Sequence, residues 1–137
     1  MFTDTHAHLF AEEFDIDRDA MMKRAEEKNV QRFFLPNIDS GSIDAMMKMV
    51  KAYPGKCFPM MGLHPCSVKG NYKGELNIVK GWLDKEKFAA IGEIGIDLYW
   101  DKSLFEQQKE AFRLQIQWAK EKKLPIVIHA RESLNEI

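Results

Sequence analysis

The stretch Thr3-Asp4-Thr5-His6-Ala7-His8, close to the N-terminus, organises the rest of the chain. A β-strand points every second side chain to the same face. We therefore expect Asp4, His6 and His8 to share a face, with the two imidazoles near the carboxyl end of a strand that starts at Phe2. Neutral imidazole is the commonest metal ligand in proteins. The pair is a candidate for one end of a divalent cation site, although two such histidines can also be ordinary exposed or hydrogen-bonded side chains.

The composition indicates one globular domain. The 137 residues are 45% hydrophobic and 30% charged, which is enough for a real core. The formal net charge of −1 excludes a large basic surface, so a nucleic-acid substrate would need local lysines, arginines or metal. Cys57 and Cys66 form no Cys-x-x-Cys pattern and are interpreted as reduced thiols. Because we find neither a signal-peptide pattern nor a membrane-spanning apolar run, the sequence predicts a cytoplasmic protein without membrane contact.

Apolar runs alternate with helical patterns along the whole chain. Strands are predicted at 2–6, 31–36, 56–61, 88–91 and 126–128, and helices over 18–29, from Ser42 to Pro54, around Leu76–Leu83 and from Ser103 to Leu124. Asp17, Ser42 and Ser103 are the expected helix caps. Crossovers of roughly 25 to 37 residues predict a parallel sheet with right-handed connections. The β-branched run Ile126-Val127-Ile128 predicts a strand buried on both faces.

A second informative stretch, Gly92-Glu93-Ile94-Gly95-Ile96-Asp97, closes the fourth predicted strand. The two glycines allow a ligand or backbone to approach the carboxylate of Glu93 closely. Opposite a His-x-His strand, Glu93 is a candidate to bridge two cations, although it could also be a loop charge. Asp97, Tyr99 and Trp100 follow. They could contact substrate, with the aromatic rings offering a stacking face for a base, or they could simply fix the loop.

Two more ionisable groups follow predicted strands. His64, in Gly62-Leu63-His64-Pro65, is expected to contact substrate or support the ligands rather than bind metal, unless it only stabilises a turn. His129 is a candidate ligand, and Arg131 could bind a phosphate or orient a neighbouring acid. These groups lie at the carboxyl ends of strands, where parallel barrels place their chemistry.

The sequence resembles the TatD family of metal-dependent deoxyribonucleases, within the amidohydrolase-like (β/α) barrels. The matching stretches are Asp4–Leu9, Gly62–Pro65, Gly92–Asp97 and Leu124–Arg131. The resemblance implies an α/β fold of the TIM-barrel type, of which residues 1–137 would be the N-terminal part, roughly the first half, with five parallel strands. It also implies hydrolysis of DNA phosphodiester bonds.

The resemblance further implies a ligand set. His6 and His8 would bind one cation, Glu93 would bridge two, and His129 would belong to the second. We expect Glu93, His64 and Arg131 to act in catalysis, and His64, Asp97, Tyr99 and Arg131 to contact substrate. The complete site would use two divalent cations, zinc, manganese, cobalt or magnesium, to activate a water for attack on phosphorus.

The chain departs from the family pattern in its length. The family's barrel needs about 250 residues, and the pattern includes a later histidine and aspartate that this sequence lacks. Ser133-Leu134-Asn135-Glu136 is a capping-box pattern that predicts the start of another helix. We therefore expect the N-terminal part of a longer protein, or a truncated product, with weak metal binding and little catalysis. Its open strand edges predict self-association or a need for the missing C-terminal half. The alternatives are another hydrolase of this barrel class and a non-catalytic half-barrel.

Overall fold

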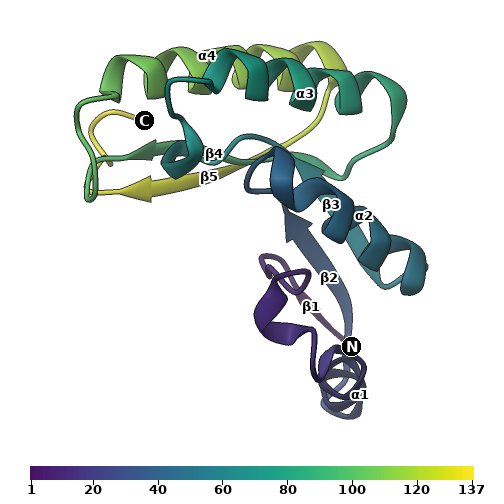
Figure 1. Cartoon of the computed structure of the whole chain (residues 1–137). Helices are drawn as coiled ribbons and strands as arrows, with labels where there is room; N and C mark the ends of the chain where they lie inside the picture. The colour runs from purple at the N-terminus through teal and green to yellow at the C-terminus, as the bar shows by residue number, and fades with distance from the viewer.

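Five parallel strands, hydrogen-bonded in the order β1-β2-β3-β4-β5, form one curled sheet (Figure 1). A computed structural model describes residues 1–137. The strands are β1 (Phe2–Asp4), β2 (Val30–Pro36), β3 (Cys57–Met61), β4 (Ala90–Asp97) and β5 (Ile126–Arg131). The helices are α1 (Arg18–Glu27), α2 (Ile43–Ala52), α3 (Tyr72–Lys85) and α4 (Phe105–Lys122), with 3-10 turns η1 (Glu12–Phe14), η2 (Ser40–Ser42) and η3 (Pro65–Ser67). The predicted parallel sheet is confirmed.

The core lies between the sheet and its helices, which pack through the apolar faces that the helical spacing predicts. On α2, Ile43, Met46 and Met49 are buried, and on α3 the predicted stripe of Leu76, Val79 and Leu83 is buried. Figure 1 shows α3 and α4 lying together over the part of the sheet formed by β4 and β5. No helix combines the length and the apolar character needed to span a membrane.

Burial differs sharply between the middle and the edges of the sheet. All eight residues of β4 are buried, whereas all three residues of β1 are exposed. The prediction that the last strand is buried on both faces is wrong, because β5 has a neighbouring strand on one side only and Ile128 remains 43% exposed. An apolar sequence pattern predicts a strand, but it does not tell how many strands pair with it and therefore how deeply it is buried.

Two strand ends differ from the sequence-based prediction. Strand β4 continues to Asp97, because it pairs with β5 as far as Asp97 opposite Arg131. Glu93 therefore lies within a strand instead of following one. Strand β1 ends at Asp4, so that His6 and His8 lie in the segment beyond it.

The predicted helix caps are wrong in detail. Asp17 and Ser42 occupy N-cap positions but make no side-chain capping bond, and α4 starts after Leu104 instead of Ser103. Residues Leu134–Glu136 form a turn. The hydroxyl of Ser133 does not cap a helix there, because it donates to the carbonyl oxygen of Ile96 at 2.6 Å.

Candidate metal centre

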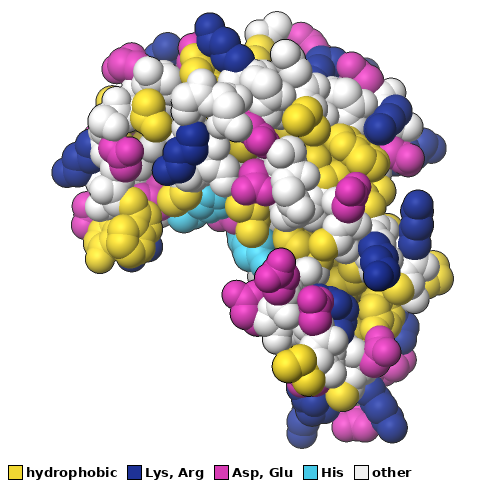
Figure 2. Space-filling view, viewed as in Figure 1, with side chains coloured by type: hydrophobic (Ala, Val, Ile, Leu, Met, Phe, Trp, Pro, Cys, Tyr) yellow, Lys and Arg dark blue, Asp and Glu magenta, His cyan; other side chains and the backbone are white.

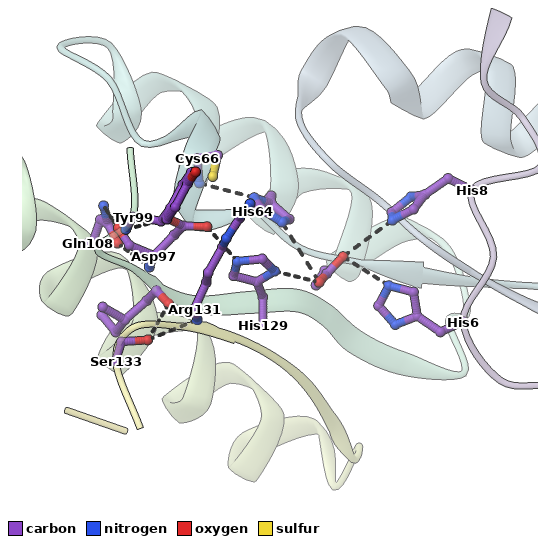
Figure 3. Close-up of polar contacts among 12 residues, drawn as sticks. His6, His8, His64, Cys66, Asp97, Tyr99, Gln108, His129, Arg131 and Ser133 are labelled. Atoms are coloured by element: carbon purple, nitrogen blue, oxygen red, sulfur yellow. Dashed lines mark hydrogen bonds and ion pairs between the residues drawn. The ribbon is translucent and has the colours of Figure 1, made fainter. Parts of the chain in front are cut away.

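The carboxylate of Glu93 lies at the centre of the site, with all of the chain's four histidines around it. Its Oε2 is 3.1 Å from His6 Nε2 and 3.4 Å from His8 Nε2. Its Oε1 is 3.1 Å from His129 Nδ1 and 3.8 Å from His64 Nε2. Figure 3 shows the imidazoles of His6 and His8 on one side and those of His64 and His129 on the other. The structure thus brings the four predicted metal ligands and His64 together.

The N-terminal imidazoles reach Glu93 through a turn. The backbone N–H of His6 donates to Asp4 Oδ1 at 3.1 Å, which bends the chain directly after β1. The N–H of Ala7 donates to the carbonyl of Phe34 at 3.1 Å and ties the segment to β2. The two imidazoles then meet edge to face, with ring centroids 5.3 Å apart. The prediction that Asp4, His6 and His8 share one face of a strand is therefore wrong. They lie in a turn, and Asp4 accepts a backbone hydrogen bond outside the histidine cluster.

His64 has a tautomer set by its surroundings. Its Nδ1 accepts a hydrogen bond of 3.0 Å from the backbone N–H of Cys66, at the start of η3. Burial lowers the pKa of His64 to about 4, even though the charge of Glu93 opposes that shift. The imidazole is therefore neutral at pH 7, and its single proton lies on Nε2, which faces Glu93. In this state His64 presents an N–H donor to the site, 3.8 Å from Glu93 Oε1, and offers no Nε2 lone pair to a cation.

Asp97 forms a hydrogen bond with the imidazole of His129 on the side away from Glu93. His129 Nε2 lies 2.7 Å from Asp97 Oδ2. Burial raises the pKa of Asp97, but the hydrogen bonds from His129, the Tyr99 N–H and Cys66 outweigh burial and lower it, so the carboxylate is ionised. Asp97 must then accept, and His129 donates from Nε2. Such carboxylate–imidazole pairs typically orient a metal-binding histidine. Asp97 is 2% exposed, which leaves it little access to the predicted substrate.

Gly95 permits the close pairing of β4 with β5 beside this histidine. Its φ of +147° lies in a region that side chains rarely adopt, and an added Cβ would stand 2.0 Å from the carbonyl oxygen of His129. Only glycine therefore allows β5 to approach closely enough for His129 to reach Glu93 and Asp97.

The charge arrangement favours a positive species between the side chains. Burial raises the pKa of Glu93, but the hydrogen bond from His8 and the charges of His64, His6 and His129 lower it to about 2. His129 donates to Asp97 from Nε2, and its Nδ1 lies 3.1 Å from the ionised carboxylate of Glu93. Without a proton of its own, Nδ1 is an acceptor like the Glu93 oxygen. Two acceptors face each other at that distance only when a proton or a cation lies between them.

The donor set fits a divalent cation. Ligands about 2.1 Å from a common cation are separated by about 3.0 Å in octahedral and 3.4 Å in tetrahedral geometry, close to the 3.1 and 3.4 Å between Glu93 and the N-terminal imidazoles. His6, His8 and Glu93 make one possible ligand group. His64, Glu93 and His129 also lie close enough to form a second group, but in the tautomer described above His64 is a donor, which leaves Glu93 and His129 as its ligands. His8 Nδ1 is also buried without a hydrogen-bond partner. Imidazole and carboxylate together suit zinc, manganese or cobalt.

A third group of possible ligands, Cys66, Asp97 and His129, is a hydrogen-bonded network instead. Burial and the hydrogen bond to Asp97 raise the pKa of the Cys66 thiol to about 11. The thiol therefore remains protonated and donates to Asp97, whereas a metal ligand would have to be a thiolate.

The remaining predicted substrate residues meet beside this cluster. The guanidinium carbon of Arg131 lies 3.8 Å from the ring centroid of Tyr99 and 5.5 Å from that of Trp100. The site itself is an open hollow, and Figure 2 shows the histidines on its floor. A separate pocket of about 720 Å³ lies between η1, α1 and α2 and contains none of the site residues.

Sequence reasoning missed three polar residues that support the site. Gln108 and Gln115, on α4, are buried and bond to the backbone of Asp97 and Leu63 respectively. Asn37, after β2, is fully buried and donates to the carbonyl of Gly62 at 3.0 Å. The sequence offered two signals for them. Gln108 and Gln115 are amides within an otherwise apolar helical stripe, and Asn37 is an amide directly after a buried strand.

The fold and this cluster define a class of protein: a parallel (β/α) barrel, here its first half, with imidazoles and a carboxylate gathered at the carboxyl ends of its strands. The chain belongs to the TatD related DNase family, whose family model matches residues 3–137. The predicted family is therefore confirmed.

Individual relatives agree with this assignment. The chain is 39% identical to the metal-dependent hydrolase YabD of Bacillus subtilis (strain 168), over 100% of this chain and 53% of that protein. It is 28% identical to the 3'-5' ssDNA/RNA exonuclease TatD of Pantoea sp. (strain At-9b), over 95% of this chain and 50% of that protein. The crystal structure of YJJV, a TatD homolog from Escherichia coli K12, matches with a TM-score of 0.90 and 28% identity, over 98% of this chain and 52% of that one.

The chain thus spans about half the length of the curated relatives it matches. Because the match to YJJV covers nearly all of this chain, the five strands correspond to about half of the related barrel. The predicted fold, a TIM-type barrel present as roughly its first half, is confirmed.

Proposed function

We propose that residues 1–137 form the N-terminal part of a metal-dependent hydrolase domain that cleaves DNA phosphodiester bonds through a centre of two divalent cations. One observation carries this proposal: the two oxygens of Glu93 face different imidazole groups, His6 with His8 and His129 with His64. A carboxylate placed in this way is suited to bridge two cations. The names of the relatives, a metal-dependent hydrolase and an ssDNA/RNA exonuclease, support the reaction class and the substrate.

Each residue has a distinct task in this proposal. His6, His8 and Glu93 would hold one cation, and Glu93 with His129 would hold part of the second. Bound cations would supply an acidified water and neutralise charge on the phosphate. The chain's own groups position the substrate: His64 donates from Nε2 toward a phosphate oxygen, and Arg131 binds phosphate through its planar guanidinium.

The second cation lacks ligands within these residues. His64 donates from Nε2 in the tautomer described above, so that only Glu93 and His129 remain for that position. We propose that a C-terminal half, present in the relatives, completes this position, and that residues 1–137 alone bind one cation well and hydrolyse DNA slowly or not at all. The predicted cytoplasmic location is in keeping with the two free cysteines, and cell fractionation tests it.

The metal centre is tested by calorimetric titration of the metal-free chain with Mn²⁺ or Zn²⁺. We expect about one tight site per chain, and Glu93→Gln should weaken it at least tenfold, because the variant removes the negative charge shared by the ligands. Glu27→Gln, an exposed carboxylate outside the site, is the matched control. Equal affinity in wild type and Glu93→Gln would refute the metal centre.

The reaction is tested separately with Mn²⁺ and a panel of labelled single-stranded DNA, a phosphate monoester, an ester and an amide. Slow DNA cleavage that disappears in Glu93→Gln supports the nuclease. Turnover of only the other substrates would identify another hydrolase of this barrel class. Rapid DNA cleavage by residues 1–137 would contradict the need for further ligands.

A further inference from the structure

Arg131 carries a positive charge that no acidic side chain neutralises. Arg18 and Arg24 pair with Asp15 and Asp17 at 2.8 and 2.9 Å. Arg131 makes no ion pair, and its guanidinium makes no hydrogen bond: only its backbone is bonded, the N–H donating to Ser133 Oγ at 3.2 Å and the carbonyl accepting from the Leu98 N–H at 3.0 Å. The guanidinium carbon lies 3.8 Å from the centroid of the Tyr99 ring, a cation–π contact that holds the side chain beside that ring. All of its N–H donors therefore remain available to an anion.

Two large aromatic rings beside Arg131 are open to solvent. Tyr99 is 46% exposed and Trp100 is 72% exposed, and the rings meet edge to face with centroids 4.7 Å apart. The loop that carries them is anchored at its start, where the N–H of Tyr99 donates to Asp97 Oδ1 at 3.0 Å. Within the loop, the N–H of Ser103 donates to Asp101 Oδ1 at 2.8 Å. An anchored loop that leaves an indole exposed offers a prepared surface for a planar ligand.

These three residues, Tyr99, Trp100 and Arg131, are called the aromatic platform below. The platform is linked rigidly to the metal centre. Arg131 follows His129 by two residues on β5, so both side chains leave the same face of the strand, about 6.6 Å apart along it. Asp97 bonds to the imidazole of His129 and to the backbone of Tyr99, and so positions both.

Tyr99 and Arg131 lie on one side of the metal centre. Figure 3 shows Tyr99 and Arg131 on the Asp97 side of the cluster, away from His6 and His8. In Figure 2, hydrophobic side chains gather at the rim of the hollow, beside the histidines.

We propose that the aromatic platform is a subsite for one unpaired nucleotide next to the phosphodiester that is hydrolysed. Arg131 binds the phosphate of this nucleotide, and its base stacks on the exposed ring of Trp100. A free guanidinium beside an exposed indole matches a phosphate joined to a planar base, and stacking tolerates any base. Because a paired base is already stacked within its duplex, the subsite selects single strands. This inference rests on the proposed nuclease function and adds a determinant of its substrate.

The test is binding of a fluorescent oligothymidylate of about eight nucleotides to the 137-residue chain, in chelator so that nothing is hydrolysed. A matching oligonucleotide with abasic sites lacks only the bases. We expect wild type to bind the intact strand about fivefold or more tightly than the abasic strand and than the same sequence as a duplex. Trp100→Ala should lower intact-strand affinity to the abasic level and leave abasic affinity unchanged.

Two further variants distinguish binding of the phosphate from stacking of the base. Arg131→Ala should weaken intact and abasic strands by the same factor. Trp82→Ala removes another tryptophan with a cation over its ring, Lys85 at 4.0 Å, on α3, and should change neither affinity. The proposal is overturned if Trp100→Ala binds the intact strand like wild type, if it weakens both strands equally, or if wild type binds no strand.

The result is independent of the nuclease assay. If the chain distinguishes intact from abasic strands but cleaves no phosphodiester, the subsite stands and the nuclease assignment fails. If DNA is cleaved while Trp100→Ala has no effect on binding, the nuclease stands and the subsite fails.

Discussion

Glu93 is a buried carboxylate that its neighbours keep ionised. Burial alone disfavours the charged form and raises the pKa of a carboxyl group. Here the hydrogen bond from His8 and the charges of the other imidazoles reverse that effect and bring the pKa to about 2. The site therefore holds a permanent negative charge at neutral pH, which is the condition for attracting a cation.

The lowered pKa of His64 predicts a pH-dependent stability. The unfolded chain binds a proton at this residue below about pH 6.5, but the folded chain binds it only below about pH 4. His64 therefore contributes stability that is fully present above pH 6.5 and is lost as the pH falls toward 4. The loss is up to about 3 kcal/mol.

Urea unfolding of the metal-free chain between pH 7 and 4 measures this effect. Protonation of Glu93 should lower the stability further at lower pH, between about 4.5 and 2, because the pKa of Glu93 is also depressed in the folded state. His64→Gln keeps an acceptor for the Cys66 N–H and should flatten the slope between pH 6.5 and 4. An unchanged slope in this variant would contradict a neutral, buried His64.

Asp97 predicts a second effect at this scale. Asp97→Asn replaces a charged acceptor behind His129 with a neutral one, so the Nε2–H tautomer of His129 should lose population. In a titration carried to high metal concentration, the weak second site at Glu93 and His129 should lose about tenfold or more in affinity for Mn²⁺ or Zn²⁺, whereas the tight site at His6, His8 and Glu93 should keep its affinity.

Imidazole ¹⁵N chemical shifts report the tautomer, and metal titration reports the affinity. Asp44→Asn, an exposed carboxylate on α2, is the control and should change neither. If His129 keeps its tautomer and its metal affinity in Asp97→Asn, then Asp97 does not position it.

At the scale of elements, α4 holds the carboxyl ends of two strands in register. Gln115 Oε1 accepts from the Leu63 N–H at 2.7 Å, beside His64. Gln108 accepts from the Asp97 N–H at 2.8 Å and donates to the Asp97 carbonyl at 3.0 Å. One helix therefore fixes the spacing between the segments that carry His64 and Asp97.

Gln115→Leu should destabilise the chain by about 1–3 kcal/mol, because the Leu63 N–H would be buried without an acceptor. Gln117→Leu, on the exposed side of the same helix, should change stability by less than about 0.5 kcal/mol. Equilibrium urea unfolding measures both. Equal effects of the two substitutions would show that the Gln115 bond contributes nothing beyond its helix position.

At the scale of the whole molecule, a parallel sheet ends in two uncovered edges. In a closed barrel the first and last strands are covered by neighbours, but here Phe2 on β1 is 65% exposed and Ile128 on β5 is 43% exposed. Exposed edges with unpaired backbone groups favour pairing with another chain.

We therefore predict that residues 1–137 self-associate, with a solution mass above that of one chain in light scattering at micromolar concentration. Ile128→Lys should shift the chain toward the monomer, because a charge on the β5 edge opposes pairing. Ile78→Lys is a closely matched control, since Ile78 on α3 is 44% exposed and lies away from both edges. A wild-type chain that is monomeric at every concentration would contradict this prediction.

The sequence by itself determined the order of strands and helices, the family, and the residue types at the carboxyl ends of the strands. It could do so because helical and strand periodicities are local, and because the parallel topology brings separate strand ends together. His6, His8, Glu93 and His129 were candidate ligands on that basis, and the family resemblance implied how they divide between two cations.

Only the tertiary structure decided how these groups face one another. The contacts of Glu93 with imidazoles on both sides and the bond between Asp97 and His129 depend on segments far apart in the chain. The Nε2 proton of His64 depends on the bond that its Nδ1 accepts from the Cys66 N–H. The exposure of β5 likewise depends on which strands surround it. Sequence periodicity tells which side of a helix or strand is apolar. Tautomers, ligand directions and burial depend instead on which other segments the fold places beside that helix or strand.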